Sequence, residues 1–109
     1  MVVLFSFLTS YAISQKSETS RPTVFIQTNA QCEDCKERIE GVLNFEKGIM
    51  YSSLDLETKK IEVKYNAKRT SLEKIKNTIA AIGYDADDVK AVKTAQSALP
   101  ECCQPGGHD

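Results

Sequence analysis

The chain has 109 residues, a length that suits a single domain with one modest hydrophobic core. Its 14 basic and 15 acidic residues nearly cancel, and the basic residues do not gather with aromatic ones in a patch that would favour nucleic acid. The sequence shows no catalytic triad, carboxylate pair or phosphate-binding loop, so we expect a binding protein and not an enzyme.

The first 14 residues carry no charge, and the apolar run over 2–8 is followed by small residues at Ala12 and Ser14. This pattern is typical of a secretory signal peptide, although no Lys or Arg precedes the run. The run is also shorter than the about 20 apolar residues that span a bilayer. We expect a signal peptide over 1–14, an exported (periplasmic or secreted) protein and a disordered lead-in over 15–22. A buried N-terminal strand is the alternative.

The next segments alternate between strand and helix patterns. Residues 23–28 are mostly β-branched or aromatic and predict a strand. The apolar spacing then becomes that of one helix face, with matches at Cys35, Ile39, Val42 and Leu43. Gly48 ends this segment. Alternating apolar residues over 49–56 and 61–65 predict two more strands.

A second helix is indicated after residue 70. The sequence over 70–73, TSLE, matches a capping box, and Gly83 stands where a helix C-cap belongs. Residues 84–89 predict a last strand, although their three Asp residues are poor strand formers. The order βαββαβ predicts an α+β, ferredoxin-like sandwich with a four-stranded antiparallel sheet and two helices on one face. We assign this domain to 23–90.

The residues that carry chemistry are Cys32 and Cys35, a CxxC pair at the start of the first helix. Cysteines three apart at a helix start lie on the same face, and the helix N-terminus favours the thiolate. Thiolates select soft ions, and two of them suit Cu(I) or Hg(II) while leaving Zn(II) short of its usual four ligands. Glu33 and Asp34, between the thiols, oppose the helix effect and are expected to raise the thiol pKa values.

The segment from Thr23 to Val89 resembles the heavy-metal-associated domain family, which includes copper chaperones, periplasmic mercuric-ion-binding proteins and N-terminal domains of metal-pumping P-type ATPases. The matching motifs are the CxxC, IEGVL over 39–43, Gly48, TSLE over 70–73 and IGYDA over 82–86. The resemblance implies metal binding for chaperoning, scavenging or detoxification, with Cu(I) favoured and Zn(II) or Hg(II) as alternatives. A metal-transporting ATPase or another acceptor protein is the implied partner.

One residue near the CxxC matches the family pattern, and the segment before the first Cys departs from it. Bacterial members have a Tyr beside the metal loop, and Tyr84 matches it, either as a shield for the ion or as simple packing. The family usually has Gly-Met-Thr before the first Cys, where this chain has NAQ over 29–31. The family Met packs under the loop, and Ala30 is too small to fill that space.

A redox pair is the alternative for the same motif, because thioredoxin-like enzymes also place CxxC at a helix start. Against it, no Trp precedes the pair, and neither Gly nor Pro lies between the cysteines. A disulfide between Cys32 and Cys35 is a third reading for an oxidising compartment.

A second cluster, Cys102, Cys103 and His108, lies in the extension over 91–109. The spacing of Val92, Ala95 and Leu99 predicts a short helix, which Pro100 stops. A last strand of about 20 Å followed by a returning helix of about 15 Å would bring these cysteines back to the CxxC loop. We therefore expect accessory ligands there, with incidental thiols in a disordered tail as the alternative.

Overall fold

The structure is a computed structural model that describes residues 20–104. The expected signal peptide over 1–14, the lead-in as far as residue 19, and His108 lie outside the described residues. Within 20–104, no helix has the length and apolar character needed to cross a membrane.

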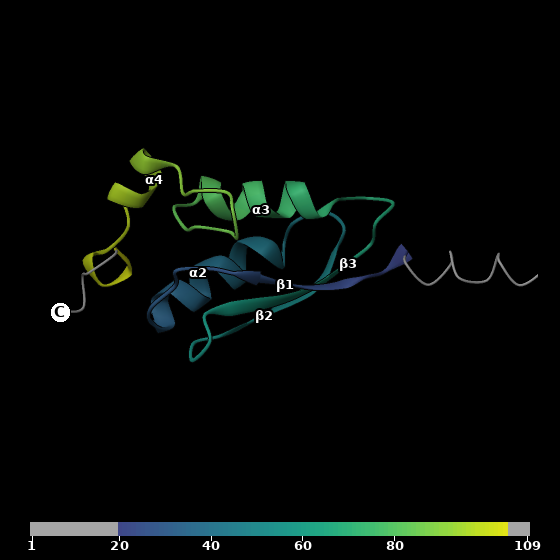
Figure 1. Cartoon of the computed structure of the whole chain (residues 1–109), viewed down its shortest axis with the longest axis horizontal. Helices are drawn as coiled ribbons and strands as arrows, with labels where there is room; N and C mark the ends of the chain where they lie inside the picture. Colours follow the sequence, from purple (N-terminus) through teal and green to yellow (C-terminus); the bar gives the residue numbers. More distant parts are fainter. Residues whose placement is uncertain (1–19, 105–109) are drawn as a thin grey trace, which may run out of the picture.

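Three antiparallel strands form the sheet, in the spatial order β1-β3-β2 (Figure 1). They are β1 (Thr23–Gln27), β2 (Ile49–Asp55) and β3 (Lys60–Tyr65). Val24 pairs with Val63 and Ile26 with Ile61 across β1 and β3. Because side chains alternate along a strand, these four residues point to one face of the sheet, which carries the core.

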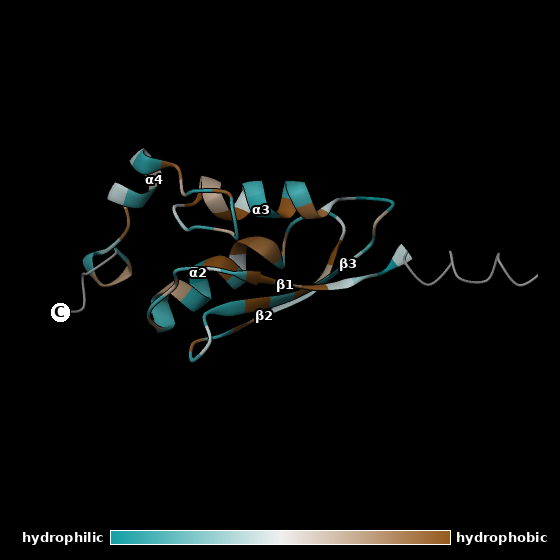
Figure 2. Cartoon of the chain, viewed as in Figure 1, coloured by the Kyte–Doolittle hydropathy of each residue, from teal (hydrophilic) through white to brown (hydrophobic). Residues whose placement is uncertain are grey.

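Two helices, α2 (Glu33–Leu43) and α3 (Leu72–Ala81), cover that face. Their apolar residues turn toward the sheet, as the brown side of α3 in Figure 2 shows. The buried helix residues are Cys35, Ile39, Leu43, Ile75, Ile79 and Ala80. The α+β, ferredoxin-like arrangement predicted from the sequence is therefore confirmed, with Cys35 on the buried face of α2.

The start of α3 differs by one residue from the predicted capping box. The N-cap is Ser71, whose side-chain oxygen accepts a hydrogen bond from the Lys74 backbone N–H at 3.1 Å. A cap at Thr70 is thus wrong, and the residue three after the cap is a Lys and not a Glu. At the other end, Gly83 follows the Ile82 C-cap with φ +108°, as the predicted C-cap glycine requires.

The predicted fourth strand over 84–89 is not formed as a strand. Ala86 alone bridges to Thr28, and the chain then reverses in a tight turn whose Ala86 and Val89 backbones exchange two hydrogen bonds of 2.9 Å. Asp87 adopts φ +53°, a conformation that Asp tolerates better than most residues and that ends strand pairing. The three Asp residues therefore favour a turn over an edge strand.

The described part of the extension contains two short helices. They are α4 (Lys93–Ser97) and the 3₁₀ turn η3 (Glu101–Cys103). The predicted short helix is confirmed, and Pro100 stands between α4 and η3. Leu99 is only 8% exposed and belongs to the same core cluster as the sheet and helix residues. Burial of Leu99 therefore anchors the extension to the domain.

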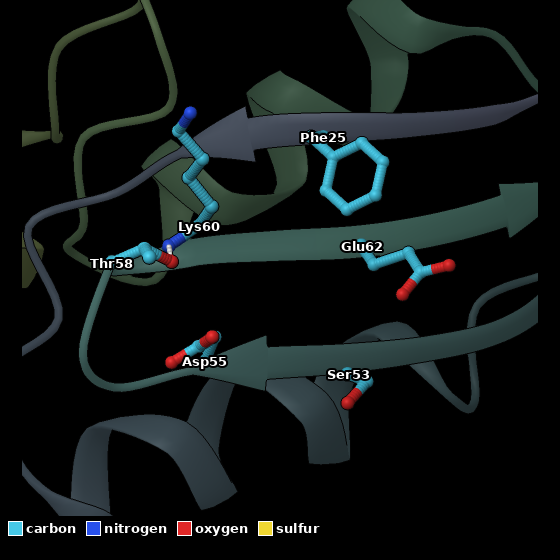
Figure 3. Close-up of a pocket in the computed structure, with 6 residues that line it drawn as sticks. All are labelled: Phe25, Ser53, Asp55, Thr58, Lys60 and Glu62. Carbon is cyan, nitrogen blue, oxygen red and sulfur yellow. Dashed lines mark hydrogen bonds between the residues drawn. The ribbon is translucent and has the colours of Figure 1, made fainter.

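The face of the sheet opposite α2 and α3 carries a shallow hollow (Figure 3). Its lining residues are Phe25, Ser53, Asp55, Thr58, Lys60 and Glu62. Phe25 is 62% exposed there. No thiol or imidazole lines this hollow, so it lacks the donors that a soft metal ion needs.

Candidate metal centre

The CxxC pair lies where the loop over 28–31 meets the start of α2. Cys32 is the N-cap residue, with extended φ −146° and ψ 174°, and its side chain does not cap the helix. Cys35, in the first turn of α2, is fully buried. The two Sγ atoms are 3.2 Å apart. The predicted pair is thus brought together, with Cys32 on the outer side and Cys35 on the core side.

The metal loop over 28–31 is held by its own polar side chains. The Thr28 hydroxyl donates to the Lys59 carbonyl at 2.8 Å and accepts from the Ala30 N–H at 3.1 Å. The Asn29 side-chain oxygen accepts from the Asp85 N–H at 3.0 Å. Sequence reasoning missed both positioning residues. Polar residues between a strand and the CxxC were the available signal for the local bond between Thr28 and Ala30, because such side chains commonly bond to nearby backbone.

The C-terminal turn η3 lies at the same end of the molecule as the start of α2 (Figure 1). From Cys32 Sγ, the distance to Cys102 Sγ is 3.6 Å and the distance to Cys103 Sγ is 3.7 Å. The sulfurs of Cys102 and Cys103 are 3.9 Å apart. The predicted return of the extension to the CxxC loop is confirmed, and four thiols converge on one place.

A side chain that the sequence reasoning did not single out fastens the turn to the metal loop. Gln31 Nε2 donates to the Gln104 carbonyl at 2.6 Å and to the Cys102 carbonyl at 3.5 Å. Gln104 in turn donates from its side chain to the Leu99 carbonyl at 2.8 Å. Nothing in the local sequence indicates such a tether, because its two ends lie about 70 residues apart. Capping and turn patterns in a sequence reveal only bonds between residues a few positions apart.

The four thiols differ in environment. Burial raises the pKa of Cys35, but hydrogen bonds from the Gln31 backbone and the neighbouring thiols, together with the nearby Tyr84 hydroxyl, outweigh burial, so its pKa is lowered. The expected rise from Glu33 and Asp34 is therefore wrong for Cys35, since both carboxylates are exposed and neither is among its causes. Burial above all raises the pKa of Cys103 to about 12.

The pKa of Cys102 is also raised, chiefly by its hydrogen bond with Cys32 and by burial. Asp34 contributes in the same direction, because the Cys102 thiol donates to its carboxylate at 3.6 Å. Of the three thiols whose pKa values are shifted, Cys35 is thus the one that ionises most readily.

Tyr84 lies in the core beside this group and is only 1% exposed. Its hydroxyl is buried and makes no hydrogen bond of good geometry within the described residues. Burial, followed by the nearby thiols of Cys103 and Cys35, raises the pKa of the hydroxyl. Tyr84 therefore both packs in the core and presents a spare donor next to the two buried thiols.

The sequence is similar to short segments of two copper ATPases. A copper-exporting P-type ATPase of Staphylococcus saprophyticus is 37% identical over 70 residues, which are 62% of this chain and 9% of the ATPase. Copper-transporting ATPase 1 of Mus musculus is 36% identical over 64 residues, 59% of this chain and 4% of that protein. The chain thus spans less than a tenth of the length of either relative.

Solved structures share the fold. The CopZ metallochaperone has a TM-score of 0.58 at 24% identity, over 60% of this chain and 98% of its own. Oxidized MerP from Ralstonia metallidurans CH34 has a TM-score of 0.59 at 20% identity, over 62% of this chain and 94% of its own. The heavy-metal-associated domain model matches residues 24–85, more than half of the sequence. The chain therefore belongs to the heavy-metal-associated domain family.

Proposed function

We propose that this protein binds Cu(I) through the thiolates of Cys32 and Cys35 and exchanges the ion with an acceptor protein. The observation that carries the proposal is the pair of sulfurs 3.2 Å apart at the N-terminal end of an 11-residue helix. The helix end and its free N–H groups favour thiolates, and thiolates prefer soft ions.

The relatives support copper as the ion and an ATPase as the acceptor. Two of them are named as copper-exporting and copper-transporting ATPases, and one structural neighbour is a metallochaperone. We propose the heavy-metal-associated domain of such an ATPase as the partner, since two CxxC sites can pass an ion through shared ligands. Zn(II) and Hg(II) are the competing ions. His108, outside the described residues, stays a proposed accessory ligand.

The first prediction is that the reduced protein retains one Cu(I) per chain in native mass spectrometry and prefers it over Zn(II). Thiolate softness gives this order, and two thiolates leave Zn(II) under-coordinated. Protein alkylated with iodoacetamide is the control and should retain no Cu(I). Equal Cu(I) retention by the alkylated protein would overturn the proposal.

A thiol–disulfide enzyme is the second candidate, favoured by the lowered pKa of Cys35 and its 3.2 Å distance to a second thiol. Such an enzyme would reduce insulin disulfides with turnover, whereas a metal carrier would not. We expect no turnover from the reduced protein with a thiol reductant present. Turnover without Cu(I) retention would establish the redox function in place of metal binding.

The second prediction concerns Tyr84→Phe, which removes only the buried hydroxyl. Because a buried hydroxyl without a good hydrogen bond costs stability, we expect its removal to raise the free energy of unfolding by about 1 kcal/mol, the low end of that cost. A thiolate ligand would accept its proton when an ion is bound, so we expect Cu(I) affinity to fall about tenfold, within the range for groups that support metal ligands.

Urea denaturation of the metal-free protein and Cu(I) competition titration check the two parts separately. Tyr65→Phe is the matched control, because Tyr65 is also buried but lies on β3. An unchanged Cu(I) affinity in Tyr84→Phe would reduce Tyr84 to a packing residue.

A further inference from the structure

The three sulfurs of Cys32, Cys102 and Cys103 form a nearly equilateral triangle, with edges of 3.6, 3.7 and 3.9 Å. We propose that these residues form a three-thiolate centre that closes over a bound Cu(I) and retains it. The inference rests on the proposed function and deepens it: the ion that the CxxC pair captures is retained by Cys32 together with the two thiols of the C-terminal turn, which replace Cys35 as ligands.

The triangle already has the size that a metal–thiolate centre needs. Its centre lies about 2.2 Å from each sulfur. A typical metal–thiolate bond has nearly the same length, about 2.3 Å. A small ion therefore fits within the plane, or slightly above it, with the side chains almost where they are. Within residues 20–104, no other three or more ligand atoms of His, Cys, Asp or Glu all lie within 4.8 Å of one another.

The CxxC pair alone is less well prepared. Two sulfurs on opposite sides of an ion lie about 4.6 Å apart when each bond is about 2.3 Å. The Cys32 and Cys35 sulfurs are 3.2 Å apart, so linear coordination requires the loop to open. The triangle requires no such movement, and it is the arrangement that the folded chain presents.

The same geometry favours three ligands over four. Cys35 is not part of the group whose ligand atoms all lie within 4.8 Å of one another. A tetrahedral Zn(II) site of four thiolates would need all four sulfurs at comparable mutual distances. Cu(I) does not share that requirement, because d¹⁰ monovalent copper accepts low coordination numbers with soft thiolates.

The folded chain holds the second pair of thiols in place. Leu99, three residues before Cys102, is buried in the core, and Cys103 itself is only 2% exposed. Gln31 bonds the turn to the metal loop at 2.6 Å through the Gln104 carbonyl. These contacts pre-position the thiols, which lowers the ordering entropy that coordination would otherwise require.

A closed centre changes how the ion leaves. A partner thiolate or small chelator must compete with three thiolates, two of them carried by η3, so release is slower than from a two-thiolate CxxC pair. The turn therefore biases the protein toward retaining copper until an acceptor engages the same end of the molecule.

The test compares the full chain with the Cys102→Ser/Cys103→Ser variant, using Cu(I) as the probe. X-ray absorption should count three sulfurs per copper in the wild type and two in the variant. Cu(I) affinity, measured against a competing chelator, should fall at least about tenfold, since even groups outside the coordination shell contribute about 10–100-fold. The rate of copper transfer to that chelator should rise.

Two further variants sharpen this comparison. Gln31→Ala keeps all four thiols but removes the tether, so we expect an intermediate loss of affinity and faster transfer. Ser53→Ala, on the open sheet face, should match the wild type. Circular dichroism of each metal-free variant confirms folding.

Two sulfurs per copper in both the wild type and the double Ser variant, with equal affinity, would overturn the three-thiolate centre and leave the proposed function standing. Four sulfurs in the wild type would also overturn it. Loss of Cu(I) binding from the wild type itself would instead refute the proposed function.

Discussion

Cys32→Ser is expected to lower Cu(I) affinity by about 100-fold or more, because it removes a ligand and not merely a supporting group. Cys32 Sγ lies 3.2 Å from Cys35 and 3.6 and 3.7 Å from Cys102 and Cys103, so every arrangement of the thiols uses it. Cys35→Ser is the matched variant. It leaves the triangle of the other three sulfurs intact, and we expect only about a tenfold loss.

Competition titration of both reduced variants against the same chelator measures this asymmetry. A plain CxxC site predicts comparable, large losses in both variants, because each variant removes one of its only two ligands. Comparable, large losses would therefore indicate that the C-terminal thiols stay outside the coordination shell. A larger loss in Cys35→Ser would place the ion deeper, against the core side of α2.

The elements that the sequence predicted well are those whose signals are local. The helix face through Cys35, Ile39 and Leu43 follows from spacing alone, and the structure buries all three residues. The strands of the sheet alternate as their sequences do. The CxxC pair could be placed at a helix start for the same reason, since strand, loop and helix follow one another directly in the chain.

The elements that were predicted wrongly depend on competition between neighbouring signals. Residues 84–89 are predicted as the strand that completes the βαββαβ order, yet the turn preference of Asp87 and Asp88 prevails. The side chain of Asp87 still bonds to the edge of β1, accepting from the Gln27 N–H at 2.8 Å. The edge is thus covered by a turn where a strand was expected.

The metal loop shows why the extension matters to the domain. The family resemblance implies a Met where Ala30 stands, and a small residue there predicts empty space. Ala30 is nevertheless fully buried, in the same core cluster as Leu99 and Cys103. Residues of the extension, which the family pattern does not include, therefore belong to the same core as Ala30. Local sequence does not reveal this shared core, because Ala30 and the extension lie some 70 residues apart.

The junction between α3 and the extension depends on one glycine. Gly83 has φ +108°, a conformation that side chains rarely adopt, and a Cβ there would lie 3.1 Å from the Ala95 carbonyl and the Gln96 Cα. The obstacle is backbone of α4, which cannot rotate away as a flexible side chain would. Gly83→Ala must therefore either strain the α3 C-cap or displace α4.

We expect Gly83→Ala to lower the free energy of unfolding by about 2–6 kcal/mol, the sum of the ranges for backbone strain and for overpacking. Urea denaturation of the reduced, metal-free protein measures it. Gly41→Ala is the matched control: a Cβ there meets nothing within 4 Å, and α2 should gain about 0.5–1 kcal/mol. Displacing α4 also moves the chain that leads to Cys102, so Gly83→Ala should lower Cu(I) affinity with all four thiols present. An unchanged unfolding free energy would show that α4 does not pack on Gly83, and the anchored thiol turn would lose its support.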